Sequence, residues 1–424
     1  MMKKKVLLVV CAALALCLLA GCTVMPVSTL DTMFRGTSSA PAGEGDVGDN
    51  GDTVTISRER YERYRQFDEL LELEDAVDTY YYKEPDHEKM VQGAAAGLLA
   101  GLGDHYTFYY TPEDWTKMWE DEEGEYAGIG ILISSNYKTG LCTISRVFKG
   151  SPAEAAGVHR GDILYRVGED LYVVPDTVQD AVDVMRGTPG TPVEVTFLRG
   201  GEEMTYTLNR AIITVNQVES TVLEDGIGYI AVYQFAGEVD KEFEKALTGL
   251  IDQGVTDVII DLRDNPGGWV DDSQNIADQF LDEGDVCYLL YRDGHEEHVY
   301  RTKDGKVDIK HVVLLVNENS ASSSEILTGA LRDRMGATVV GVKTYGKGIV
   351  QLVMPVGKNG AGFQITTAEY RTPNGTAVHE VGLTPDVEIP LEEGDNGMYD
   401  FADTEKDPQL KKALEVMREK RKEK

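Results

Sequence analysis

Basic residues, cysteine and histidine are scarce in this sequence, and each shortage argues against a class of protein. Lys and Arg number 41 against 73 Asp and Glu, for a formal net charge of −32. Because no basic stripe is present to meet phosphates, we do not expect the chain to bind nucleic acid. The 5 cysteines and 7 histidines form no cluster with the spacing of metal ligands. We therefore predict neither a metal site nor a cofactor.

The first 21 residues have the pattern of a bacterial lipoprotein signal peptide. Lysines at positions 3–5 precede an apolar run, Val6–Leu18. Leu19-Ala20-Gly21-Cys22 then resembles a lipobox, in which the cysteine is lipidated. A lipid on Cys22 would anchor the protein to a membrane without spanning it, with its domains outside the cytoplasm, at the cell surface or in the periplasm. An ordinary cleaved signal or a short anchor is the alternative.

The next segments are expected to be a tether and a helical region. Residues 23–52 are rich in Ser, Thr, Gly, Pro and Asp, which is typical of a flexible linker. Residues 57–103 have helical periodicity, interrupted at Pro85. Such helices outside a core often mediate contacts between subunits, so a homodimer is one expectation and packing on their own chain is the other.

Residues 120–210 predict a compact β-rich domain. A glycine-rich turn, Gly128-Ile129-Gly130-Ile131, runs into a strand, and Asp176–Arg186 has the pattern of an amphipathic helix. Between them lie Ser151–Val158 and Gly161–Val167, and together these segments resemble a PDZ domain of the bacterial protease type. The resemblance implies capture of a protein's C-terminus, with a peptide strand added beside Ile131–Ile133. Backbone amides near Ala127–Gly130, a stretch that includes Gly128 and Ile129, would hold the carboxylate of that peptide. The alternative is that the glycines only form a hairpin turn.

From Val215 onward, strand and helix patterns alternate, which predicts a mainly parallel sheet covered by helices. The patterns at Ile349–Pro355 and Phe363–Tyr370 indicate a hairpin. An apolar stripe in the last residues predicts a terminal helix. The two cysteines outside the N-terminal segment, Cys142 and Cys287, fall in different predicted domains, so we expect two separate buried thiols, with a disulfide left open.

A serine cluster follows the predicted buried strand His311–Val316 and opens a helix. A serine at such a turn can be held exposed near the positive end of the helix dipole, where a nucleophile is well placed. Ser322-Ser323-Ser324-Glu325 is also a capping box, and both interpretations can hold for one turn. Lys347 lies between two glycines, and a buried lysine can serve as a base for a serine if its pKa is lowered.

Three segments follow one another along the chain: Asp-Leu-Arg-Asp-Asn-Pro-Gly-Gly at 261–268, Asn-Ser-Ala-Ser-Ser-Ser-Glu-Ile at 319–326, and Tyr-Gly-Lys-Gly-Ile-Val-Gln at 345–351. With Leu102–Tyr106 and the PDZ-like domain before them, they resemble the carboxyl-terminal processing peptidases, also called tail-specific proteases, over about residues 57–390. The resemblance implies an α/β core of the Clp protease/crotonase-like type. It also implies Ser322 as nucleophile, Lys347 as general base and Gln351 as the residue that orients the lysine. The chain departs from the family at Ser323, where alanine is commoner.

The chemistry of acyl transfer suggests the remaining site residues. A tetrahedral intermediate needs preset donors, and the Gly267-Gly268 turn can bring a bare amide close because it has no side chain. The Ser323 amide is the natural second donor. Arg186, at the end of the PDZ-like helix, falls where the family can place a residue that couples peptide binding to the protease.

The alternative base is a histidine in a Ser/His/Asp triad. The sequence has no Gly-x-Ser-x-Gly elbow, and His379, beside Glu380, is the best of a poor set of candidates. The predicted division of the chain is a signal peptide (1–21), a flexible tether (22–56), an N-terminal helical region (57–115), a PDZ-like domain (116–210), a serine protease core (211–390) and a C-terminal acidic, then basic, helical tail (391–424).

The sequence therefore predicts a serine endopeptidase that binds protein C-terminal tails and cuts near them. A catalytically silent tail-binding scaffold is the alternative from another class. A hydrolase of small amides or esters is a third possibility on the same fold.

Overall fold

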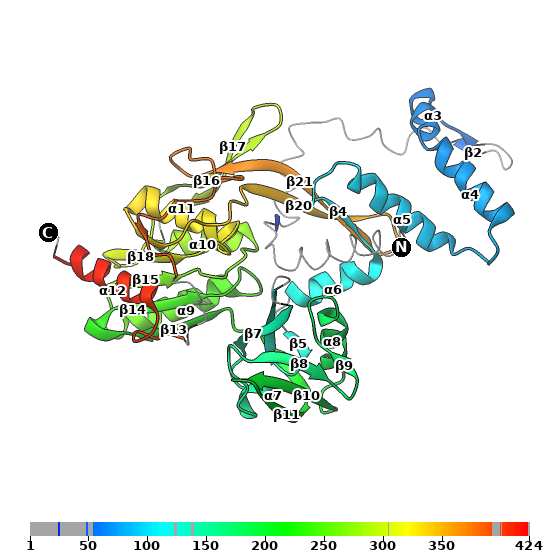
Figure 1. Cartoon of the computed structure of the whole chain (residues 1–424). Helices are drawn as coiled ribbons and strands as arrows, with labels where there is room; N and C mark the ends of the chain where they lie inside the picture. Colours follow the sequence, from blue (N-terminus) through cyan, green and yellow to red (C-terminus); the bar gives the residue numbers. More distant parts are fainter. Residues whose placement is uncertain are drawn as a thin grey trace. The chain divides into compact units, whose positions relative to one another are not determined.

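The computed structural model describes residues 24–25, 48–49, 54–122, 125–136, 140–303, 305–391, 399 and 401–422. The predicted signal peptide, Cys22 and most of the tether lie outside these residues. The chain divides into two compact units, one with residues 116–350 and 367–424 and the other with residues 25–115 and 351–366 (Figure 1). Among the described residues, no helix is both long enough and apolar enough to cross a membrane.

The β-rich domain in the first unit has the predicted glycine-rich turn and amphipathic helix. Its main sheet has the order β11-β10-β8-β7-β6, so β6 is an edge strand. The core is built from alternating inward residues, with Ile144, Leu164 and Phe197 fully buried. The elements are β5 (Glu125–Gly128), β6 (Ile131–Asn136), β7 (Leu141–Val147), α7 (Pro152–Ala155), β8 (Ile163–Val167), β9 (Leu171–Tyr172), α8 (Val178–Met185), β10 (Pro192–Arg199), β11 (Glu202–Asn209) and β12 (Ala211–Thr214), which pairs with β5.

The second sheet of this unit is mainly parallel, as the alternating pattern predicts. Its order is β13-β14-β15-β18-β19-β22, with only β13 antiparallel to its neighbour. Every residue of β14 and β15 is buried, as expected for central strands covered on both faces. The elements are β13 (Val218–Val222), η2 (Glu224–Gly226), β14 (Gly228–Val232), α9 (Val239–Ile251), β15 (Asp257–Asp261), α10 (Val270–Asp278), β18 (His311–Val316), α11 (Ser323–Met335), β19 (Thr338–Gly341) and β22 (Val387–Glu388).

The C-terminal helix, α12 (Pro408–Lys420), packs on the sheet of this α/β core. Leu410, Leu414 and Met417 are fully buried in a cluster with residues of β14, β15, β18 and β19. The predicted apolar stripe is therefore confirmed, and it packs on its own chain. Cys142 and Cys287 are both buried and not disulfide-bonded, as predicted.

The predicted hairpin is confirmed as β20 (Ile349–Val356) and β21 (Ala361–Arg371). In the first unit, residues 368–371 of β21 pair with β16 (Gly284–Tyr291), which in turn pairs with β17 (Glu296–Thr302). In the second unit, residues 362–364 of β21 pair with β4 (Phe108–Tyr110).

The second unit also contains the predicted helical region. Its helices α3 (Arg58–Arg65), α4 (Asp68–Tyr80) and α5 (His87–Ala100) bury none of their residues. Helix α6 (Pro112–Glu122) follows β4, and the two-residue strands β1 (Val24–Met25), β2 (Gly48–Asp49) and β3 (Val54–Thr55) precede α3.

Candidate active site

The site forms where two adjacent parallel strands end. Strand β15 pairs in parallel with β18, so the turns that follow them lie at the same edge of the sheet. The turn after β15 carries Gly267 and Gly268, and the turn after β18 carries Ser322. The Ala321 amide donates to the Asn265 carbonyl oxygen at 3.1 Å. Two of the three motifs predicted from sequence are therefore in direct contact.

Ser322 stands at a strained turn at the start of α11. Its φ is +59° and its ψ is −117°, in a region that non-glycine residues rarely adopt. Such a conformation costs about 1–3 kcal/mol and persists where surrounding structure enforces it. The Ser322 amide donates to Glu325 Oε2 at 2.9 Å, so the glutamate half of the predicted capping box is present.

Glu325 joins the serine turn to the lysine loop. Its fully buried carboxylate accepts hydrogen bonds from the amides of Ser322 (2.9 Å), Gly346 (2.8 Å) and Lys347 (2.9 Å), and from Thr344 Oγ1 (2.5 Å). Burial raises the pKa of Glu325, and these hydrogen bonds oppose the rise. The four donors all favour the ionised carboxylate.

The lysine loop is packed too tightly for side chains beside Lys347. A Cβ on Gly348 would lie 2.1 Å from the His379 amide nitrogen, and Gly346 has a φ of +91°. Lys347 is only 1% exposed. Tyr370 links the loop to the serine. Its amide donates to the Gly348 carbonyl oxygen (2.9 Å), and its hydroxyl donates to the Ser322 backbone carbonyl oxygen (3.2 Å). The predicted nucleophile and base thus belong to one buried, hydrogen-bonded assembly.

The glycine turn has the geometry of a donor site for an oxyanion. A Cβ on Gly267 would lie 2.7 Å from Ser322 Cβ, and one on Gly268 would lie 1.9 Å from the Phe235 oxygen. The Gly267 amide donates to Asn265 Oδ1 at 2.9 Å, so Gly267 provides close approach and not a donor. Among the described residues, the Gly268 and Ser323 amides make no backbone hydrogen bond. These two amides therefore remain available.

Ser323 has a role that its sequence position does not reveal. Its hydroxyl donates to the Gly268 carbonyl oxygen at 2.8 Å, and the Ser324 hydroxyl donates to the Asn265 oxygen at 2.9 Å. Both side chains fasten the glycine turn to the start of α11. The hydroxyl at position 323, where the family commonly has alanine, thus holds the turn.

Gln351 is fully buried on β20. Its Nε2 donates to Thr366 Oγ1 at 3.3 Å. Its Oε1 is buried and accepts no hydrogen bond from the residues that the structure describes. An acceptor in this condition costs free energy unless a donor reaches it, and the role predicted for Gln351 stays a prediction.

The histidine alternative finds no support in the geometry. A triad histidine needs a carboxylate on Nδ1 to fix its tautomer. His379 Nδ1 is buried and has no hydrogen-bond partner among the described residues.

The residues predicted to bind peptide lie at one end of the β-rich domain. Ile131 begins the edge strand β6, and Ile129 is buried in the domain core. Gly130 has a φ of +84°, and a Cβ there would lie 2.2 Å from Ser151 Cβ. The Gly187 amide donates to the Ala127 oxygen at 3.2 Å, which places the glycine-rich turn beside the end of α8. A Cβ on Gly128 would lie 3.8 Å from the Met185 oxygen of α8.

Arg186 is the exposed residue that caps α8. Its guanidinium lies over the Tyr126 ring, 5.2 Å from the centroid. The peptide-binding and coupling roles of these residues stay predictions.

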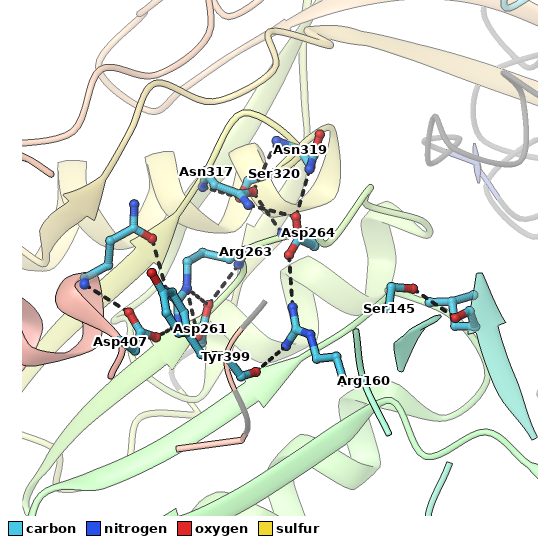
Figure 2. A network of polar contacts seen from close by, with 12 residues as sticks. Ser145, Arg160, Asp261, Arg263, Asp264, Asn317, Asn319, Ser320, Tyr399 and Asp407 are labelled. Atoms are coloured by element: carbon cyan, nitrogen blue, oxygen red, sulfur yellow. Dashed lines mark hydrogen bonds and ion pairs between the residues drawn. The ribbon is translucent and has the colours of Figure 1, made fainter. Parts of the chain in front are cut away.

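A buried charge network joins the end of β15 to the start of α12 (Figure 2). Arg263 Nη2 donates to Asp261 Oδ2 at 2.6 Å and to Asp407 Oδ2 at 2.7 Å. Asp407 is the N-cap of α12. Burial alone would raise the pKa of Asp261, but the charge and hydrogen bonds of Arg263, together with the Tyr229 hydroxyl, hold it below the ordinary value of 3.8.

Comparisons with known proteins agree with this geometry. Residues 226–389 match the model of peptidase family S41, and residues 143–199 match a PDZ domain model. The chain is 34% identical over 359 residues to the carboxy-terminal-processing protease of Bartonella bacilliformis, covering 82% of this chain and 80% of the relative. It is 36% identical over 304 residues to the carboxyl-terminal-processing protease of Synechocystis sp., covering 69% and 70%.

A solved structure of the photosystem II D1 C-terminal processing protease is similar, with 28% identity and a TM-score of 0.52 over 74% of this chain and 86% of that one. The fold and the relatives define a serine-type peptidase. The chain belongs to peptidase family S41, among the carboxy-terminal-processing proteases. This membership favours the peptidase over the silent scaffold.

Proposed function

We propose that this protein is a membrane-anchored serine endopeptidase that recognises protein C-terminal tails through its PDZ domain and cleaves near them by a Ser/Lys mechanism. The observation that carries the proposal is the Glu325 carboxylate, which ties the backbone of Ser322 to that of Lys347 inside a buried site. Sites that need preset geometry are built this way.

In this mechanism Lys347, as an amine, takes the proton of the Ser322 hydroxyl while the serine oxygen attacks the peptide carbonyl. The amides of Gly268 and Ser323 meet the resulting oxyanion. Lys347 returns the proton to the leaving amine, and water then hydrolyses the acyl-enzyme. Gln351 orients Lys347 through its side-chain amide.

Tail recognition is proposed to occur on β6. An edge strand offers unpaired backbone groups to an added peptide strand, and the glycine-rich turn before it has amides for a terminal carboxylate. The substrates are proteins or peptides with an accessible C-terminus, which distinguishes this function from hydrolysis of small amides.

Lipidation of Cys22 is proposed to anchor the protein to a membrane, with its domains at the cell surface or in the periplasm. The charged start, apolar run and lipobox-like residues of the sequence support this proposal. The test is metabolic labelling with a fatty acid analogue in a bacterial host, where Cys22→Ser should lose the label and the membrane fraction. Equal labelling of both proteins would refute lipidation at Cys22.

The experiment for tail recognition compares two versions of one unstructured substrate, with a free or an amidated C-terminus. Mass spectrometry follows the fragments made by the wild type and by Ser322→Ala. We expect the wild type to cut the free-tailed substrate faster and Ser322→Ala to cut neither. Equal rates on both substrates would remove the C-terminal carboxylate from the proposal.

A further inference from the structure

Asp264 joins the glycine turn to the serine loop. Its Oδ1 accepts hydrogen bonds from Asn317 Nδ2 and Asn319 Nδ2, each at 2.8 Å, and its amide donates to Asn317 Oδ1 at 2.9 Å (Figure 2). Its φ is +60°, an unusual value for a residue with a side chain. Asp264 stands three residues before Gly267, and Asn319 stands three before Ser322. A shift of Asp264 would therefore move both turns.

The other carboxylate oxygen of Asp264 faces the PDZ domain. Arg160, in the loop between α7 and β8, places Nη2 at 3.7 Å from Asp264 Oδ2, and its Nη1 donates to the Tyr399 oxygen at 2.8 Å. Figure 2 shows Arg160 reaching both groups. The PDZ domain thus contacts the residue that connects the predicted nucleophile and oxyanion turns.

A second arginine of the same domain makes a different kind of contact. Arg146 is 10% exposed, lies 3.5 Å from the Tyr233 ring centroid and donates to the Asn216 oxygen. Because this contact is buried, salt screens it little. The Arg160 and Asp264 side chains are 29% and 49% exposed, so their ion pair is weak, screened by salt and easily altered when the domain is loaded.

We propose that Arg160 is a positioning residue for the peptidase reaction, which through its ion pair with Asp264 aligns the glycine turn with Ser322. The proposal rests on the proposed function, because it assigns a route by which the state of the PDZ domain reaches the reacting groups. Arg160 itself touches neither substrate nor the reacting atoms.

The test uses the full chain with Arg160→Gln, Asp264→Asn, the double variant and Arg160→Lys. Asparagine at 264 tolerates a positive φ and keeps an oxygen for Asn317 and Asn319. The matched control is Arg166→Gln, because among the described residues Arg166 makes its polar contacts within its own domain, with Gly168, Glu169, Thr196 and Glu194. The measurements are kcat and KM on an unstructured protein at low and high NaCl, and the melting temperature.

We expect Arg160→Gln and Asp264→Asn each to lower kcat about two- to fivefold at low salt with KM unchanged, as a partly exposed ion pair allows. The double variant should be no slower than either single variant, Arg160→Lys should recover most of the activity, and high salt should bring the wild type toward Arg160→Gln. Additive losses, or a change in melting temperature with kcat unaffected, would overturn the role.

A fluorophosphonate probe separates this inference from the proposed function, since it labels an activated serine without a peptide. A protein that labels at Ser322 but cuts no peptide would contradict the proposed function. Equal labelling rates in the wild type and Arg160→Gln would contradict the positioning role. Absence of labelling in the wild type would contradict both.

Discussion

At the residue scale, the Glu325 carboxylate holds the serine turn and the lysine loop together. The carboxylate accepts four hydrogen bonds. In Glu325→Gln an NH₂ group, which is itself a donor, would replace one carboxylate oxygen and could not accept the hydrogen bonds made to that oxygen. Since a lost buried charged hydrogen bond costs about 1.5–3 kcal/mol, we expect kcat to fall about tenfold or more. Steady-state kinetics measures this, with exposed Glu415→Gln as control. An unchanged kcat would show that the link is not needed.

Loss of the Ser323 hydroxyl should lower kcat less than loss of the Ser322 hydroxyl. Ser323→Ala removes the hydrogen bond to the Gly268 oxygen and leaves the Ser323 amide in place. We expect kcat to fall about two- to tenfold with KM unchanged, because one neutral hydrogen bond contributes about 1 kcal/mol. Steady-state measurement of kcat and KM tests this, with Ser220→Ala, a change at an exposed serine, as control. A loss as large as that of Ser322→Ala would mean that the two serines are assigned the wrong way round.

Sequence reasoning reached some of these residues and missed others for a physical reason. Ser322 and Lys347 were predicted because their neighbours form motifs within a few positions. The hydrogen bonds by which Asn265 and Glu325 connect separate turns could not be predicted, because they depend on which turns meet at the sheet edge. Glu325 was interpreted only as a cap, since its contacts with the lysine loop cross 19 residues of chain or more. Gly267 was grouped with the donors, although its amide is taken by Asn265.

At the element scale, the charge network between β15 and α12 is expected to control stability with pH. A carboxyl whose folded pKa is lowered stabilises the fold above its ordinary pKa, and this contribution is lost as pH falls through the folded pKa. Asp261 is such a group. In Arg263→Met, Asp261 and Asp407 would stay buried without their cation, so the free energy of unfolding should fall by about 3–5 kcal/mol at pH 7.

The deficit of Arg263→Met should shrink as pH falls toward 3.8, because protonation then removes the unpaired buried charge of Asp261. Denaturant unfolding at pH 7 and near pH 4 measures both values. Arg301→Met is the control, since Arg301 pairs with Asp285 at the surface. A deficit that is the same at both pH values would contradict the assigned charge state.

The elements themselves were largely predictable, because apolar runs and helical stripes are local. The patterns at His311–Val316 and Ile349–Pro355 correspond to β18 and β20. The stripe of α12 was predicted too, but its packing on the core sheet was not, since a stripe does not say what covers it. The pairing of β15 with β18 also could not be predicted from local patterns, because it depends on the order of strands in the sheet. This pairing brings the two turns of the site together.

At the scale of the whole molecule, the N-terminal helices offer the clearest surface for self-association. Leu70 and Leu71 of α4 follow Phe67 by three and four residues, which places the three side chains on one side of the helix, and they are 45%, 57% and 42% exposed. Large apolar side chains grouped in this way often mark an interface. We propose a homodimer through this face. Light scattering should give a dimer for the wild type and a monomer for the double variant Phe67→Glu and Leu71→Glu, with Leu141→Glu as control. A wild-type monomer at all concentrations would refute the dimer.

The central claim is that Lys347 activates Ser322. Cleavage of an unstructured protein by Lys347→Met, which keeps the side-chain bulk and removes the amine, tests it most directly beside Lys343→Met, an exposed lysine on the same loop. We expect Lys343→Met to cut like the wild type and Lys347→Met, like Ser322→Ala, to lose about a thousandfold or more in kcat. Cleavage by Lys347→Met at the wild-type rate would contradict it.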